Sequence, residues 1–87
     1  MSQPYEIFLR SEAVDELRKI RGISRRQLTA YIDLLAQEPF SEGDYTVKDE
    51  SGRGIHIKVL GQYAVTFWAD HPVKEIRIVD IRSADRA

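Results

Sequence analysis

The sequence has 87 residues, a formal net charge of −1 and no cysteine. A chain of this length is expected to form one domain, spanning residues 1–87, with a thin core. The lack of cysteine excludes disulfides and thiolate metal ligands, and two histidines far apart in sequence disfavour a zinc site. We therefore expect no metal and no cofactor. The near-neutral charge also argues against strong non-specific binding of nucleic acid.

Nothing in the sequence indicates a membrane protein. The first residues, "MSQPYEIFLR", contain no apolar run after a basic stretch, as a signal peptide would. No segment approaches the roughly 18 continuous apolar residues of a membrane span. We expect a cytoplasmic protein without a membrane partner.

The first half of the chain predicts a strand followed by two helices. "PYEIFLR" has the alternation of a strand, with one apolar side. Ser11 is expected to cap the first helix, and Gly22 to end it in the left-handed conformation. The segment from Ser24 to Gln27, "SRRQ", has the form of a capping box and starts the second helix. Pro39 ends that helix. Apolar residues recur at helical spacing in both predicted helices: Ala13, Val14, Leu17 and Ile20, then Leu28, Tyr31, Ile32 and Leu35.

The second half predicts strands at residues 45–48, 54–59, 63–69 and 73–81, with a turn at 70–72. The order of elements is therefore strand, helix, helix and four strands. It indicates an α+β fold in which a helical hairpin packs on a mostly antiparallel, twisted sheet.

The register of the central hairpin can be argued from its apolar pattern. A two-residue turn would pair Lys58 with Val65 and mix charge into the core face. A three-residue turn instead pairs Ile57 with Val65, and Ile55 with Phe67, so that apolar residues share one buried face. We therefore predict the three-residue turn. The other face then collects His56, Lys58, Ala64, Thr66 and Trp68.

The last strand changes phase. Ile76 and Ile78 alternate, whereas Val79 and Ile81 follow in the opposite phase. A bulge near residues 78–79 would keep Ile81 inside the core. It would also turn three charged residues to a common face: Arg77, Asp80 and Arg82.

The order of elements, together with "ELRKI", "IDLLAQEPF", "GIHIKVLGQYAVTFW" and "IRIVDIRSADRA", resembles the RelE/ParE superfamily of toxins from type II toxin–antitoxin systems. The resemblance covers nearly the whole chain. It implies a RelE-like, ribosome-dependent mRNA endoribonuclease that inhibits translation, requires no metal, and is neutralised by a cognate antitoxin protein. Its partners would be the antitoxin, the ribosome and mRNA. The resemblance matches His56, Lys58 and Arg82 to the basic positions of the family's catalytic site.

RNA cleavage by a 2′-hydroxyl needs a base, an acid and cations near the phosphate. His56 would transfer the proton, because histidine is the residue type suited to acid–base catalysis near neutral pH, while Lys58 and Arg82 would bind the phosphate. Trp68 would stack a base, and Thr66 and Arg77 complete the predicted substrate-binding residues. Each has a purely structural alternative: an ordinary half-exposed strand for His56 and Lys58, packing for Trp68, and an ion pair with Asp80 or Asp85 for Arg82.

Two positions depart from the family pattern. Ala64 stands where a phosphate-binding arginine is usual, and no tyrosine follows Arg82. These departures leave two other hypotheses open. The chain would be a ParE-like inhibitor that contacts DNA gyrase without catalysis, or a catalytically weakened relative that mainly binds its antitoxin.

Overall fold

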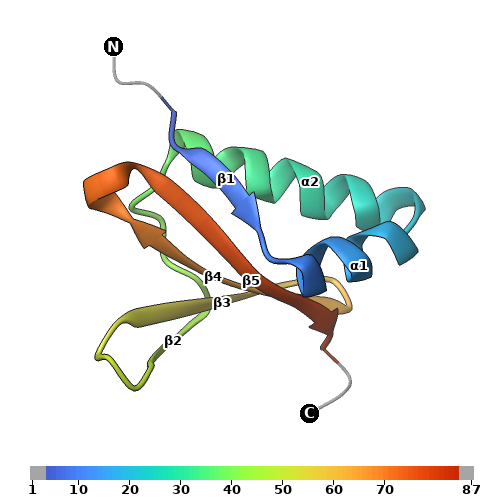
Figure 1. The fold of residues 1–87 in the computed structure, drawn as a ribbon. Coiled ribbons are helices and arrows are strands. Elements are labelled where there is room, and N and C mark those ends of the chain that lie inside the picture. The colour runs from blue at the N-terminus through green and yellow to red at the C-terminus, as the bar shows by residue number, and fades with distance from the viewer. Residues whose placement is uncertain (1–3, 85–87) are drawn as a thin grey trace.

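The computed structural model describes residues 4–84, and its elements follow the predicted order (Figure 1). The strands are β1 (Glu6–Leu9), β2 (Tyr45–Lys48), β3 (Gly54–Leu60), β4 (Tyr63–Asp70) and β5 (Glu75–Ser83). The helices are α1 (Ser11–Lys19) and α2 (Gly22–Gln37), and a 3-10 turn, η1 (His71–Val73), joins β4 to β5. The predicted α+β class is confirmed.

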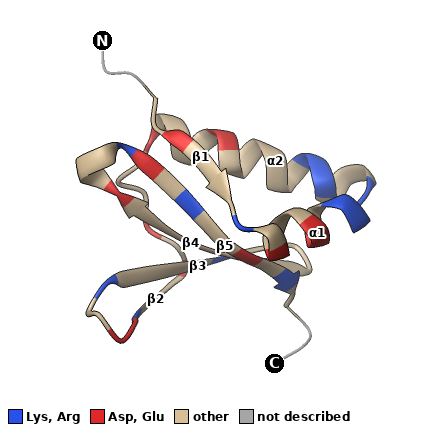
Figure 2. Cartoon of the chain, in the orientation of Figure 1, with Lys and Arg blue, Asp and Glu red and all other residues tan. Residues whose placement is uncertain are grey.

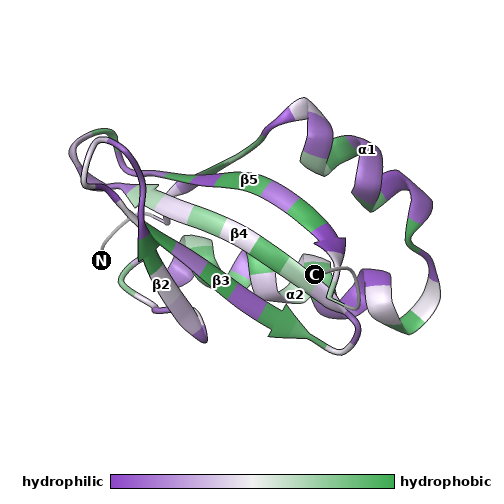
Figure 3. Ribbon diagram, turned by 90° about the horizontal axis from the view of Figure 1, so that it is seen from below, coloured by the Kyte–Doolittle hydropathy of each residue, from purple (hydrophilic) through white to green (hydrophobic). Residues whose placement is uncertain are grey.

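The five strands form one mixed sheet in the order β1-β5-β4-β3-β2. β1 pairs with β5 in parallel, and all other neighbours are antiparallel. Both helices lie on the same side of the sheet (Figure 1), and the view from below shows the sheet in front of α2 (Figure 3). The opposite side, which we call the helix-free face, carries Ile57, Ala64, Thr66, Trp68, Arg77, Asp80 and Arg82.

The core lies between the helices and the strands β4 and β5. β4 contributes Val65 and Phe67, which are almost completely buried, and β5 contributes three buried isoleucines. Across from them lie buried residues at helical spacing, as the sequence predicted: Ala13, Leu28, Ile32 and Leu35. Full burial of each large side chain contributes roughly 1.5–3 kcal/mol, so these few residues dominate the stability of a small domain.

The helix ends differ from the prediction. Neither helix has a side-chain cap at its N-terminus, so the predicted serine caps are wrong. Gly22 does adopt the left-handed conformation, with φ of 68°, but it opens α2 two residues earlier than expected. Arg25 then reaches back, and its Nη1 donates to the carbonyl oxygens of Leu17 (2.6 Å) and Ile20 (3.5 Å). The end of α1 is thus satisfied by a guanidinium from α2.

The bulge in β5 is confirmed. Thr66 lies opposite Asp80, whereas the next residue, Phe67, lies opposite Ile78, so Val79 is the extra residue. Ile81 is fully buried on the core side. The bulge therefore restores the alternation that the phase change would have broken.

The predicted register of the β3–β4 hairpin is wrong. The turn has two residues, Gly61 and Gln62, and it pairs Lys58 with Val65. Gly61 has φ of 61°, which a two-residue turn with glycine at its first position accommodates without strain. The tight turn prevails because β3 lies toward the margin of the sheet, where polar side chains on the helix side still find partners.

Candidate functional site

The structure separates the three residues that were predicted to be catalytic. His56 and Lys58 lie opposite Phe67 and Val65, and therefore on the side of the helices. Arg82 lies opposite Ala64 on the helix-free face. A single phosphate cannot contact all three side chains, so the prediction that they converge on one site is wrong. The cause is the one-residue difference in the turn, which reverses the direction of every side chain in β3.

His56 is held by structural contacts on the helix side. The backbone N–H of Gly43 donates to its Nδ1 at 3.2 Å, and the hydroxyl of Thr46 lies 3.2 Å from the same nitrogen. Its ring stacks on Phe67 with centroids 5.3 Å apart. The imidazole thus anchors the segment that follows α2 onto the edge of the sheet.

Lys58 is also engaged on that side. Its Nζ lies 3.2 Å from Oδ1 of Asp44. The backbone N–H of Val59 donates to Asp44 Oδ2, and this bond and that of Lys58 lower the pKa of the carboxyl below its usual value. Burial, with a further contribution from the Asp44 charge, raises the pKa of Tyr31 to about 12. The arrangement supports the structural alternative for both His56 and Lys58.

The helix-free face brings together the other predicted residues. Around Arg82 lies a shallow pocket of about 330 Å³, bordered by Arg10, Glu12, Thr66, Val79, Asp80 and Arg82. Arg82 forms an ion pair with Asp80, one of the two partners that the structural alternative proposed. Thr66 stands directly opposite Asp80 on the neighbouring strand. A hydroxyl, two guanidinium groups and two carboxylates therefore surround one small hollow.

A second pocket on the same face, of about 580 Å³, lies beside Trp68. Its border is mixed aromatic, aliphatic and charged: Phe8, Leu9, Arg10, Asp49, Arg53, Ile55, Trp68, Arg77 and Val79. Arg10 and Val79 belong to both pockets, so the two hollows adjoin. Of the six predicted site residues, Thr66, Trp68, Arg77 and Arg82 share this face.

Each of the four arginines around these pockets has a carboxylate partner. The pairs are Arg10 with Glu12, Arg53 with Asp49, Arg77 with Glu75, and Arg82 with Asp80. Figure 2 shows the resulting alternation of positive and negative segments along β5, and a separate group of positive segments where α1 meets α2. The helix-free face therefore offers guanidinium groups at fixed positions and not a uniformly positive surface.

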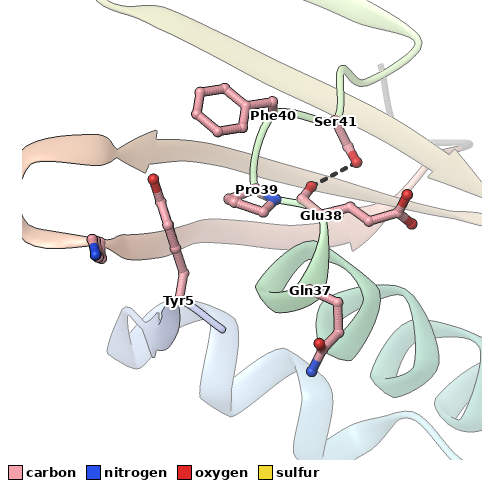
Figure 4. A pocket seen from close by; sticks show the side chains of 7 residues that line it. Tyr5, Gln37, Glu38, Pro39, Phe40 and Ser41 are labelled. Atoms are coloured by element: carbon pink, nitrogen blue, oxygen red, sulfur yellow. Dashed lines mark hydrogen bonds between the residues drawn. The ribbon is translucent and has the colours of Figure 1, made fainter. Parts of the chain in front are cut away.

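A further pocket lies on the helix side, at the end of α2 (Figure 4). Tyr5, the residue before β1, approaches it from one side, while Pro39 and Phe40 come from the segment after α2. Its charged border residues, Glu38 and Lys74, have opposite signs and give no preference for an anion.

Among residues 4–84 no group of three or more His, Asp and Glu side chains is placed to hold a metal ion. No helix in this range is long and apolar enough to cross a membrane.

Comparison with known proteins identifies the fold. No family model and no curated protein matches the sequence. Among solved structures, the RelE–RelB complex of the archaeon Pyrococcus horikoshii has a chain that superposes with a TM-score of 0.79. The identity is 20%, over 97% of this chain and 99% of that one. The chain has the RelE toxin fold. Other solved structures with this fold are the isolated Escherichia coli RelE toxin (TM-score 0.68, 16% identity, 95% and 87% covered) and the toxin–antitoxin complex RelBE2 of Mycobacterium tuberculosis (0.66, 20%, 92% and 98%).

Several residues of the helix-free face were not identified as site residues from the sequence. Phe8 and Arg10 reach it because β1 lies in parallel beside β5, a long-range pairing that no local pattern reveals. Arg53 reaches it from the β2–β3 loop, where Asp49 accepts hydrogen bonds from Ser51 and from the Arg53 backbone. The alternation of β1 did place Phe8 opposite its apolar side, and this was the one available signal.

Proposed function

We propose that this chain is the toxin of a toxin–antitoxin pair and that its helix-free face acts on mRNA at the ribosome. The observation that carries the proposal is the fold, which is shared over 92–97% of the chain with the three RelE structures, two of them complexes with an antitoxin. The partner would accordingly be a cognate antitoxin. The guanidinium groups and Thr66 of the helix-free face supply contacts that suit an RNA backbone.

The chemistry we propose is metal-independent cleavage at the pocket around Arg82. Arg82 and Arg10 would hold the scissile phosphate and stabilise the negative charge of the transition state. The 2′-oxygen forms a bond to phosphorus, its proton passes to the Asp80 carboxylate, and the 5′-oxygen leaves with a proton from solvent. Thr66 would donate a hydrogen bond to a phosphate oxygen. His56 and Lys58 have no part in this scheme because they lie on the other side of the sheet.

The test is expression of the chain without its antitoxin, followed by mapping of mRNA 5′ ends. We expect wild type to arrest growth and cut transcripts, and Arg82→Gln or Asp80→Asn to reduce cutting by about 100-fold or more. Arg26→Gln removes an exposed arginine from α2 and serves as the matched control. Cleavage that persists in both site variants but disappears in His56→Ala would overturn the assignment to the helix-free face.

A second candidate function is contact inhibition of DNA gyrase. One observation favours it: the arginines of the helix-free face are paired with carboxylates, and both histidines of the chain lie elsewhere. Such a face suits a binding protein better than an acid–base catalyst. A supercoiling assay separates the two, since a nuclease leaves gyrase active. A chain that affects neither mRNA nor gyrase, yet binds its antitoxin, would be the inactive relative.

A further inference from the structure

A row of alternating aromatic and guanidinium groups crosses the helix-free face. Phe8 of β1 lies beside Arg77 of β5, which in turn lies opposite Trp68 of β4. The Arg77 Cζ is 5.4 Å from the Phe8 ring centre and 5.8 Å from that of Trp68. Arg53 completes the row, with its Cζ 3.8 Å from the Trp68 ring centre. The first three residues come from three different strands, so the sheet itself sets their spacing.

The row forms part of the border of the 580 Å³ pocket, whose size is within the usual range for small-molecule sites. Three guanidinium groups and one carboxylate border the pocket, while Glu12 and Glu75, the partners of Arg10 and Arg77, lie outside its border. Its apolar part includes Phe8, whose side chain remains 43% exposed because no helix covers this side of the sheet. A pocket bordered by aromatic rings and guanidinium groups is complementary to a flat ring that is joined to a negatively charged group.

Arg53 occupies the position that a stacked ring would take. Its planar guanidinium lies against the indole, its side chain is 45% exposed, and its ion pair with Asp49 is long at 3.6 Å. The same Asp49 carboxylate already accepts hydrogen bonds from the Ser51 N–H, the Ser51 hydroxyl and the Arg53 N–H. Arg53 can therefore leave the indole at little cost and turn to a phosphate, while the loop that carries it keeps its shape.

We propose that this pocket binds one nucleotide of a single-stranded RNA, with its base stacked on Trp68 and its phosphate between Arg53 and Arg77. The inference deepens the proposed function and rests on it. A base inside a duplex cannot reach the indole, so the site selects single strands. Because Arg10 and Val79 also border the pocket around Arg82, the strand continues from Trp68 across the bulge toward the proposed cleavage position.

The chain contains one tryptophan, so its fluorescence reports directly on this pocket. The probe is a short single-stranded oligoribonucleotide titrated into the isolated protein. We expect it to quench Trp68, whereas a duplex of the same sequence and inorganic polyphosphate leave the emission unchanged. Quenching by polyphosphate alone would overturn the proposal, because it would indicate an anion site without base stacking. Quenching by the cognate antitoxin but by no oligonucleotide would also overturn it.

Variants test the individual contacts with labelled RNA and fluorescence anisotropy. Trp68→Leu should weaken binding about tenfold or more, and Trp68→Phe, which keeps a ring, should recover part of the loss. Arg53→Gln and Arg77→Gln should each make the slope of log affinity against log salt concentration shallower by about 0.7. Arg26→Gln on α2 is the matched charge control and should bind like wild type. Equal affinity for wild type, Trp68→Leu, Arg53→Gln and Arg77→Gln would overturn the proposal.

The binding assay needs neither ribosome nor turnover, so the two proposals can fail separately. Loss of oligonucleotide binding in a folded Trp68→Leu variant that still cuts mRNA like wild type would reject the pocket alone. Normal oligonucleotide binding by a wild-type chain that cuts no mRNA would reject the proposed cleavage alone. Circular dichroism and urea unfolding confirm that each variant is folded.

Discussion

At the residue scale, Gly43 shows how closely the segment after α2 approaches the sheet. A Cβ atom at this position would lie 2.6 Å from the carbonyl oxygen of Ile57 and 2.9 Å from its backbone nitrogen. The Gly43 N–H also donates to His56, so the segment cannot move away without losing that bond. Glycine is therefore required here for space, although its φ lies outside the left-handed range.

We predict that Gly43→Ala lowers the free energy of unfolding by about 2 kcal/mol, as expected when an added methyl group meets backbone atoms that cannot yield. Urea unfolding measures the change. Gly54→Ala is the matched control, because a Cβ there would meet only the Thr46 Cγ2 at an ordinary 3.8 Å. A Gly43→Ala variant as stable as the control would show that the segment is not packed against Ile57.

Tyr31 presents the opposite case, a polar atom that burial disfavours. Its hydroxyl is buried and has no hydrogen-bond partner among residues 4–84, while its ring packs edge-to-face on Phe67. Tyr31→Phe keeps the ring and removes the unsatisfied oxygen, so we predict a gain of about 1 kcal/mol in the free energy of unfolding. Urea unfolding of the two proteins measures it. A loss of stability of similar size would mean that the hydroxyl has a partner in solution.

At the scale of elements, the sequence predicted what depends on local pattern and missed what depends on a choice between nearly equal alternatives. The helical stripe containing Leu28 and Leu35 and the bulge at Val79 follow from periodicity alone. The hairpin register could not be predicted in this way, because the apolar residues of β3 favoured the three-residue turn that would have buried them. What decides it is the turn at Gly61, together with the partners that Asp44 and Gly43 provide for side chains on the helix side.

The candidate site divides in the same way. Thr66, Trp68, Arg77 and Arg82 could be placed on one face, since their relation depends on β4 and on the bulge. The parallel pairing of β1 with β5 brings Phe8 and Arg10 to that face. It links residues about 70 positions apart, and a local pattern carries no information about it.

The bulge allows a prediction for β5 as a whole. Deleting Val79 leaves Ile78, Asp80 and Ile81 in regular alternation, so each keeps its present face. We therefore expect the deletion variant to fold, with a free energy of unfolding within about 1 kcal/mol of wild type. It should nonetheless lose RNA binding and cleavage, because Val79 borders both pockets. Urea unfolding and the oligonucleotide titration test the two halves; an active deletion variant would show that the bulge has no part in the site.

At the scale of the whole molecule, the sheet separates a structural side from a side available for binding. The helix side uses its polar residues to fasten loops, through Asp44 to β3 and through His56 to Gly43. Asp49 organises the β2–β3 loop in the same manner. The helix-free face carries the arginines and Trp68 and is covered by no element of residues 4–84 (Figure 3). An antitoxin or an RNA can approach it without displacing the core.

This division predicts how the fold responds to acid. The backbone N–H of Val59 and then Lys58 lower the pKa of Asp44, and the Ser51 hydroxyl and then the Arg53 N–H lower that of Asp49. The unfolded chain binds protons at these carboxyls at a higher pH than the folded chain does. Their contribution is therefore complete above the ordinary value of 3.8 and is lost as the pH falls through the lower folded values.

We expect the free energy of unfolding to fall more steeply below about pH 4 in wild type than in the Asp44→Asn, Asp49→Asn double variant. Asp33→Asn on α2 is the control, and urea unfolding across this range measures the slopes. Equal slopes in wild type and the double variant would mean that these two carboxylates do not fasten the loops.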